Sequence, residues 1–202
     1  MDRQSTCRLS VGTKIKPDSQ DMVAYFFVSS WIGLGSESMS RVVLLTGRPR
    51  IGKTTVLMKA IDLLRERGWV VGGMVSSEIR RSGRRVGFSI SDLESGKSGI
   101  LAHIELREGP SVGKYRVNLE DLEHIGVGAI QAALRESEIV CCDEIAPMEL
   151  SSPIFRETIR RALQSGKPLL ATIHEAGRDS LLQEIKKGQD LEILEVTAEN
   201  RD

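Results

Sequence analysis

The stretch LLTGRPRIGKTT, residues 44–55, constrains the fold more than any other part of the chain. It matches the pattern G-x-x-x-x-G-K-[ST] through Gly47, Gly52, Lys53 and Thr54. The apolar run RVVLLTG precedes it, and apolar residues at helical spacing follow it. A strand, a glycine loop and a helix in this order place backbone N–H groups at a helix N-terminus, where they bind anionic oxygens. The pattern therefore predicts a phosphate-binding loop between a buried strand and a helix.

The side chains of this loop suit nucleotide phosphates. Lys53 is expected to reach the β- and γ-phosphates, and the Thr54 hydroxyl is expected to bind Mg²⁺. Arg50 stands where many such loops have another glycine. If its backbone needs a positive φ, the strain costs about 1–2 kcal/mol, which a functional site tolerates. The Arg50 cation could lie along the phosphates, block tight binding or point to solvent; we expect tolerated binding with an additional positive charge.

The rest of the chain alternates between strand and helix patterns. A helix over 54–67 is expected to end at Gly68. Further strands are expected at 69–77, 138–144, 167–174 and 191–196, and further helices at 119–135, 153–164 and 178–187. Glycine turns at 82–83 and 95–96 separate strand-like runs that predict an antiparallel hairpin insertion, which residues 114–117 could continue. The predicted fold class is α/β, a mostly parallel, doubly wound sheet with a β-hairpin insertion.

The segment IVCCDE ends a predicted buried strand with two carboxylates. Ligands of such sheets bind at the carboxyl ends of the strands, so these side chains should meet the phosphate loop. Asp143 is expected to hold Mg²⁺ together with Thr54, and Glu144 is placed to orient and deprotonate an attacking water. The alternative interpretation is a helix cap or a surface turn.

Four arginines crowd the first glycine turn of the insertion, namely Arg80, Arg81, Arg84 and Arg85. Their cations could neutralise charge that develops in a transition state, as an arginine finger does. They could instead bind single-stranded nucleic acid, but only Phe88 is available nearby for stacking, which argues against a nucleic-acid partner. A solvated hairpin tip is the third interpretation.

Taken together, the motifs TGRPRIGKTT, EIRRSGRRVGFSI, GKYRV, DEIAPMEL and ATIH resemble one known family. These are the small nucleoside-triphosphatases of archaea and thermophilic bacteria, whose vertebrate relative is called cancer-related nucleoside triphosphatase. The resemblance covers residues 41 to about 196. It implies a RecA-like core and Mg²⁺-dependent hydrolysis of ATP, GTP, CTP and UTP or TTP with broad base tolerance.

The resemblance also assigns residues. As nucleotide-binding residues it implies Gly47, Arg48, Pro49, Arg50, Ile51, Gly52, Lys53, Thr54 and Thr55 in the loop, and Val140, Cys141, Cys142, Asp143, Glu144, Ile145 and Ala146 at the acidic strand. As catalytic residues it implies Glu144, Lys53, Arg80, Arg85 and His174, with Glu149 also on the γ-phosphate side. An ordinary polar strand terminus is the alternative for His174. The family usually has glycine at the positions of Arg50 and Ala146, which puts the efficiency of turnover in question.

Composition limits the partners and the compartment. Lys+Arg and Asp+Glu both number 28, so the net charge of the chain does not favour a nucleic acid or an acidic membrane as a partner. The three cysteines give no disulfide framework, which predicts a reducing, cytoplasmic setting. Residues 1–38 differ in amino-acid composition from the rest of the chain. They are expected to be an upstream extension, a disordered or partner-contacting arm, or a targeting segment. The nucleoside-triphosphatase domain is expected over 39–202, with a monomer favoured.

Three functions remain open from the sequence. Hydrolysis of nucleoside triphosphates is the leading one, and the chain has no N-K-x-D-like motif for reading guanine. A kinase for a nucleotide or another small acceptor would use the same loop, with Glu144 deprotonating a hydroxyl instead of water. A nucleotide-loaded switch with little turnover is the third.

Overall fold

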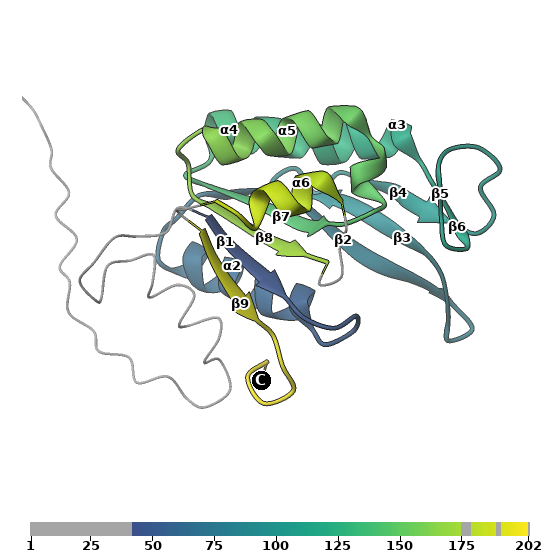
Figure 1. The fold of residues 1–202 in the computed structure, drawn as a ribbon, viewed down its shortest axis with the longest axis horizontal. Coiled ribbons are helices and arrows are strands. Elements are labelled where there is room, and N and C mark those ends of the chain that lie inside the picture. The colour runs from purple at the N-terminus through teal and green to yellow at the C-terminus, as the bar shows by residue number, and fades with distance from the viewer. Residues whose placement is uncertain (1–41, 175–178, 189–190, 202) are drawn as a thin grey trace, which may run out of the picture.

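A computed structural model describes residues 42–174, 179–188 and 191–201. The predicted extension, 1–38, and the first residues of the predicted domain, 39–41, lie outside the described residues. The described part is a nine-stranded sheet with helices on both faces (Figure 1). Within it, no helix is long and apolar enough to cross a membrane.

One half of the sheet is parallel. Its strands lie in the order β2-β7-β8-β1-β9, and neighbouring strands pair in parallel throughout. The bounds of these strands are Val42–Thr46 for β1, Val71–Arg81 for β2, Ile139–Ile145 for β7, Leu169–Ile173 for β8 and Leu191–Glu195 for β9. β1, β7 and β8 are almost completely buried, as expected for apolar runs covered on both faces.

The other half is antiparallel and continues the sheet in the order β5-β6-β4-β3, with β3 pairing to β2. Its strands are β3 (Arg84–Asp92), β4 (Ser98–His103), β5 (Ser111–Val112) and β6 (Tyr115–Val117). β2 belongs to both halves, because residues 71–74 pair with β7 and residues 74–81 pair with β3. The predicted insertion is therefore an extension of the sheet through a shared strand.

Helices cover the sheet on both sides. α2 (Lys53–Glu66) packs one face through Val56, Leu57, Ala60, Ile61 and Leu64. On the opposite face lie α4 (Gly128–Glu136), α5 (Pro153–Gln164) and α6 (Ser180–Ile185) (Figure 1). α3 (Leu119–Asp121) and a π-helical segment (Leu122–Val127) precede α4, and a 3₁₀ turn (Glu149–Ser151) precedes α5.

Local sequence explains where these helices begin and end. Gly68, with φ 87°, follows α2, and its N–H donates to the carbonyl of Arg65. Ser152 caps α5 by accepting from the N–H of Phe155, and Pro153 occupies the first turn. The predicted elements are confirmed, with one substantial difference. The strand expected at 69–77 runs to Arg81, because its second part pairs with β3 after leaving β7.

Candidate functional site

The phosphate loop joins β1 to α2 and has the backbone that anion binding requires. Gly47 has φ 142° and Gly52 has φ 112°, both in the region that favours glycine. A Cβ at Gly47 would also lie 2.6 Å from the carbonyl oxygen of Val196, so the chain after β9 leaves no space for a side chain. The loop therefore presents its N–H groups at the N-terminus of α2.

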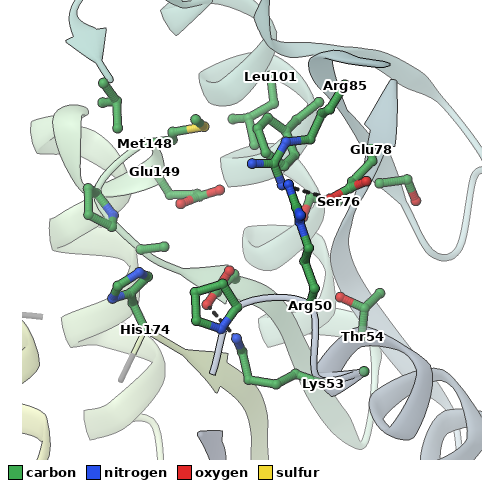
Figure 2. Close-up of a pocket in the computed structure, with 18 of the residues that line it drawn as sticks. Arg50, Lys53, Thr54, Ser76, Glu78, Arg85, Leu101, Met148, Glu149 and His174 are labelled. Carbon is green, nitrogen blue, oxygen red and sulfur yellow. Dashed lines mark hydrogen bonds and ion pairs between the residues drawn. The ribbon is translucent and has the colours of Figure 1, made fainter. Parts of the chain in front are cut away.

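Arg50 has a φ of 68°, the left-handed conformation that explains why glycine is common at this position. Its side chain is exposed and rises from the loop into the cleft (Figure 2). The strain costs about 1–2 kcal/mol. Ala146 is different, since in the described part of the chain only Arg50 and Ser82 combine a non-glycine side chain with a positive φ. Alanine is therefore unstrained at 146.

Lys53 and Glu144 face one another across the mouth of the loop. The Lys53 ammonium lies 3.3 Å from Oε1 of Glu144 and donates to the carbonyl of Gly47 at 3.4 Å. The Lys53 side chain is only 10% exposed and that of Glu144 is 27% exposed. This ion pair brings the loop and the acidic strand end together, as the two sequence motifs predicted.

Asp143 is buried at the end of β7 and is held by two threonines. Its Oδ2 accepts from the hydroxyl of Thr54 at 2.9 Å, and its Oδ1 accepts from the hydroxyl of Thr172 on β8. Burial raises the pKa of Asp143 to about 6, against the opposing effect of the two threonine hydrogen bonds. The two hydrogen bonds therefore fix the orientation of the carboxylate, but they do not offset the cost of burying its negative charge. A nearby cation would offset that cost.

The oxygen atoms of Thr54 and Asp143 fit a divalent metal. Hydroxyl and carboxylate oxygens are the ligands that hard cations prefer, and these two residues already touch. Among the described residues, no group of three or more His, Cys, Asp or Glu side chains forms a complete metal cage.

His174 and Glu149 lie at the same end of the sheet. His174 directly follows β8 and lines the cleft, and its buried Nδ1 has no hydrogen-bond partner among the described residues. Glu149 is only 3% exposed and turns its carboxyl into the cleft (Figure 2). Burial raises the pKa of Glu149 well above its ordinary value, and the negative charges of Glu144 and Asp143 add to the effect.

The arginines of the hairpin divide into two groups. Arg80 and Arg85 line the cleft, and Glu78 binds both: the closest contacts are 2.5 Å to Arg80 and 2.7 Å to Arg85. Arg85 also donates to the hydroxyl of Tyr115 at 3.0 Å. Arg81 pairs instead with Glu105, and neither Arg81 nor Arg84 is among the residues that line the cleft. Of the four hairpin arginines, only Arg80 and Arg85 line the cleft and are placed to act on a ligand.

These residues meet in a cleft of about 640 Å³ (Figure 2). Of the predicted site residues, the lining includes Pro49, Arg50, Gly52, Lys53, Thr54, Arg80, Arg85, Glu144, Ala146 and His174. Val140, Cys141, Cys142 and Ile145 are buried in β7 and do not line it, so they contribute by carrying the two acids to the strand end. Asp143 is 1% exposed and contacts the cleft through Thr54.

Sequence reasoning missed several polar residues of the site, among them Thr172 and Glu78. Thr172 holds Asp143 from inside an apolar strand, where a β-branched residue is expected for packing alone. Its position two residues before His174 in ATIH was the only available signal. Glu78 was not singled out from the sequence, although it binds both Arg80 and Arg85.

A model of the NTPase family matches residues 42–202. The chain is 51% identical over 160 residues to nucleoside-triphosphatase THEP1 of Thermofilum pendens, covering 79% of this chain and 88% of the relative. The corresponding protein of Methanosarcina acetivorans is 46% identical over 161 residues, with coverage of 79% and 90%.

Solved structures agree. The crystal structure of THEP1 from Aquifex aeolicus superposes with a TM-score of 0.71 at 30% identity, covering 80% of this chain and 92% of that one. The solution structure of a human cancer-related nucleoside triphosphatase gives 0.66 at 35% identity, with coverage of 80% and 91%. The sequence resemblance predicted a RecA-like fold, and these two structures confirm a P-loop NTPase fold. The chain belongs to the NTPase family and is a hydrolase of nucleoside triphosphates.

Proposed function

We propose that the cleft hydrolyses ATP, GTP, CTP and UTP or TTP with Mg²⁺ and with little discrimination between bases. The observation that carries the proposal is the meeting of Lys53, Glu144 and the Thr54–Asp143 pair at one end of the cleft. Base tolerance is expected because these groups would contact the phosphates and none of them would contact the base. The recognised family supports hydrolysis; the substrate range and the metal are our proposals.

Each residue has a role in this reaction. The loop N–H groups and Lys53 bind the phosphates, and the Thr54 and Asp143 oxygens would hold Mg²⁺, which supplies charge neutralisation when bound. Lys53 exchanges its contact with Glu144 for phosphate oxygens. Glu144 is then free to accept a proton from the water that attacks the γ-phosphorus. The new P–O bond forms as the bond to the β–γ bridging oxygen breaks, which releases nucleoside diphosphate and phosphate.

Arg80, Arg85 and His174 are assigned to the γ-phosphate side of the site. The two guanidinium groups line the cleft and would stabilise charge as the terminal phosphoryl group leaves. The imidazole of His174 has a free ring nitrogen with which to contact the same phosphate. For the setting, we propose the reducing cytoplasm, where the buried free cysteines Cys141 and Cys142 stay reduced. We also propose that residues 39–202 form the catalytic domain.

The test is phosphate release from the four nucleotides with Mg²⁺ and with EDTA, comparing wild type with Glu144→Gln. We expect release from all four, loss with EDTA, and a kcat about 10²–10⁴-fold lower in the variant at nearly unchanged nucleotide affinity. Glu157→Gln is the matched control, because Glu157 is an exposed glutamate of α5 paired with Arg161. Turnover only after adding an acceptor would favour the kinase, and tight binding without turnover would favour the switch.

A further inference from the structure

The cleft continues well beyond the phosphate-binding residues. Its other end, here called the far wall, consists of Glu78, Arg85, Phe88, Leu101, Val112 and Met148. Five of these belong to β2, β3, β4 and β5 of the antiparallel half, and Met148 lies across from them. Leu101, Arg85 and Glu78 gather opposite Lys53 in Figure 2. Apart from Arg85, the residues of this surface have no role in the proposed hydrolysis.

The orientation of the nucleotide leaves the far wall vacant. Lys53 and Glu144 address the γ-phosphate, so the nucleoside lies at the opposite end of the phosphate chain. The far wall is on the γ-phosphate side and faces away from the nucleoside. This step rests on the proposed function, because the position of the γ-phosphate decides which end of the cleft is free.

The far wall offers a stacking surface with little net charge. The Arg85 guanidinium lies 5.0 Å from the ring centre of Phe88 and 5.9 Å from that of Tyr115. Glu78 and the Tyr115 hydroxyl fix it in place. Flat guanidinium and aromatic groups beside aliphatic side chains bind planar rings. Because Glu78 offsets the charge of Arg85 within the far wall, the surface suits a neutral or singly charged ligand.

Glu149 adds a polar group that still needs a partner. Glu149 is only 3% exposed and lines the cleft. Its Oε2 has no hydrogen-bond partner among the described residues. An unsatisfied buried oxygen costs about 1–3 kcal/mol. The carboxyl points into the space between the phosphate-binding residues and the far wall (Figure 2). A hydroxyl group of a ligand at the far wall would satisfy it.

We propose that the far wall and Glu149 form a second binding site, on the γ-phosphate side, for a small planar-ring compound that carries hydroxyl groups, with nucleosides as the class. The ring packs against Arg85, Phe88 and Leu101, and a sugar hydroxyl bonds to Glu149. The compound binds together with the nucleoside triphosphate and does not compete with it.

The test is a two-step calorimetric titration. The protein is first saturated with the β,γ-imido analogue of ATP and Mg²⁺, which fills the nucleotide site, and is then titrated with adenosine, guanosine, cytidine and uridine separately. We expect at least one nucleoside to bind with 1:1 stoichiometry and a Kd below about 1 mM. Wild type that fails to bind the analogue contradicts the proposed function. Wild type that binds the analogue but no nucleoside overturns this inference alone.

Two sets of variants locate the second site. Val112→Trp fills the far wall and should weaken nucleoside binding at least tenfold, whereas Val70→Trp, at a half-exposed valine outside the cleft, should not. Glu149→Leu should weaken nucleoside binding about tenfold, because it removes the acceptor for the sugar hydroxyl, and Glu149→Gln should restore part of the affinity. Nucleoside binding that is unchanged in both Val112→Trp and Glu149→Leu would overturn the assignment.

Discussion

The two ends of the cleft are built in different ways. The phosphate-binding end uses residues at the carboxyl ends of β1, β7 and β8, three neighbouring parallel strands. The far wall uses side chains on the faces of antiparallel strands. Phosphates are bound by backbone N–H groups and a few charges, which short contiguous motifs supply. A ring-binding surface needs side chains from several strands, so it appears only once the chain has folded.

The two ends also differ in how their polar groups are satisfied. At the phosphate-binding end, Arg50 is strained, and burial raises the pKa of Asp143. At the far wall, Glu78 pairs with two arginines, and Arg85 has a further partner in Tyr115. Strain and uncompensated charge therefore collect where phosphate and metal would bind. The following changes test this contrast, beginning with the largest expected effect.

Thr172→Val should lower kcat roughly 10- to 100-fold, because one oxygen of buried Asp143 loses its donor at a cost of about 1–3 kcal/mol. Phosphate release over a Mg²⁺ titration is the measurement, and the Mg²⁺ requirement should rise. Thr172→Ser should recover most of the rate. Thr158→Val, at a buried threonine of α5, is the matched control. A Thr172→Val enzyme with wild-type Mg²⁺ dependence would show that Thr54 alone positions Asp143.

Arg85→Ala should lower kcat about tenfold, a smaller loss, because Glu78 and Tyr115 hold this guanidinium at the far wall. Steady-state kinetics on ATP measures it, with Arg84→Ala at the exposed end of the same hairpin as the control. A loss of about 10³-fold or more would mean that Arg85 leaves Glu78 and contacts the γ-phosphate directly, beyond the longer-range charge stabilisation proposed above. In that case the two ends of the cleft act as one.

Asp179→Asn should lower the free energy of unfolding by about 1 kcal/mol at pH 7, because Asn keeps the cap of α6 but loses the charge paired with Arg156. That pairing lowers the pKa of Asp179. A depressed pKa stabilises the fold above the ordinary value near 3.8, and this contribution is lost as the pH falls through the folded value.

Urea unfolding at a series of pH values checks this dependence. The difference between wild type and Asp179→Asn should shrink below about pH 3.8 and then vanish. Asp62→Asn, on exposed α2 surface, controls for the loss of one negative charge. A difference that stays constant down to pH 2 would assign the effect to packing.

Arg50→Gly should have the smallest effect. Loss of an exposed cation beside the phosphates should weaken ATP binding about two- to fivefold. Relief of backbone strain is offset by the greater flexibility of glycine in the unfolded chain, so stability should change by less than about 1 kcal/mol. Titration with the β,γ-imido analogue and thermal unfolding measure the two quantities. Identical affinity in Arg50→Gly would remove Arg50 from phosphate binding.

The sequence predicted the phosphate-binding end because its chemistry depends on adjacent residues. Gly47, Gly52 and Lys53 lie in one short segment, and Asp143 and Glu144 are neighbours. Both segments were placed correctly by the rule that ligands bind at the carboxyl ends of parallel strands. The positive φ of Arg50 was also foreseeable, since glycine is the usual residue there.

The far wall was not predictable in the same way. Phe88, Leu101 and Val112 come from three strands, and each alone has the pattern of a residue that packs the core. Thr172 was missed because a threonine within a strand normally fills space. The second role of β2 was missed because its outer part, residues 76–81, is mostly polar and does not continue the apolar run that ends at Val75.

That unbroken strand has a mechanical consequence. β2 extends over 11 residues, or about 36 Å at 3.3 Å per residue. Its base lies against β7, whose end carries Asp143 and Glu144, and its outer part carries Glu78 and Arg80. A displacement of the outer part would therefore act directly on the backbone that borders β7. The two ends of the cleft are thus joined by one continuous strand, with no loop between Met74 and Glu78.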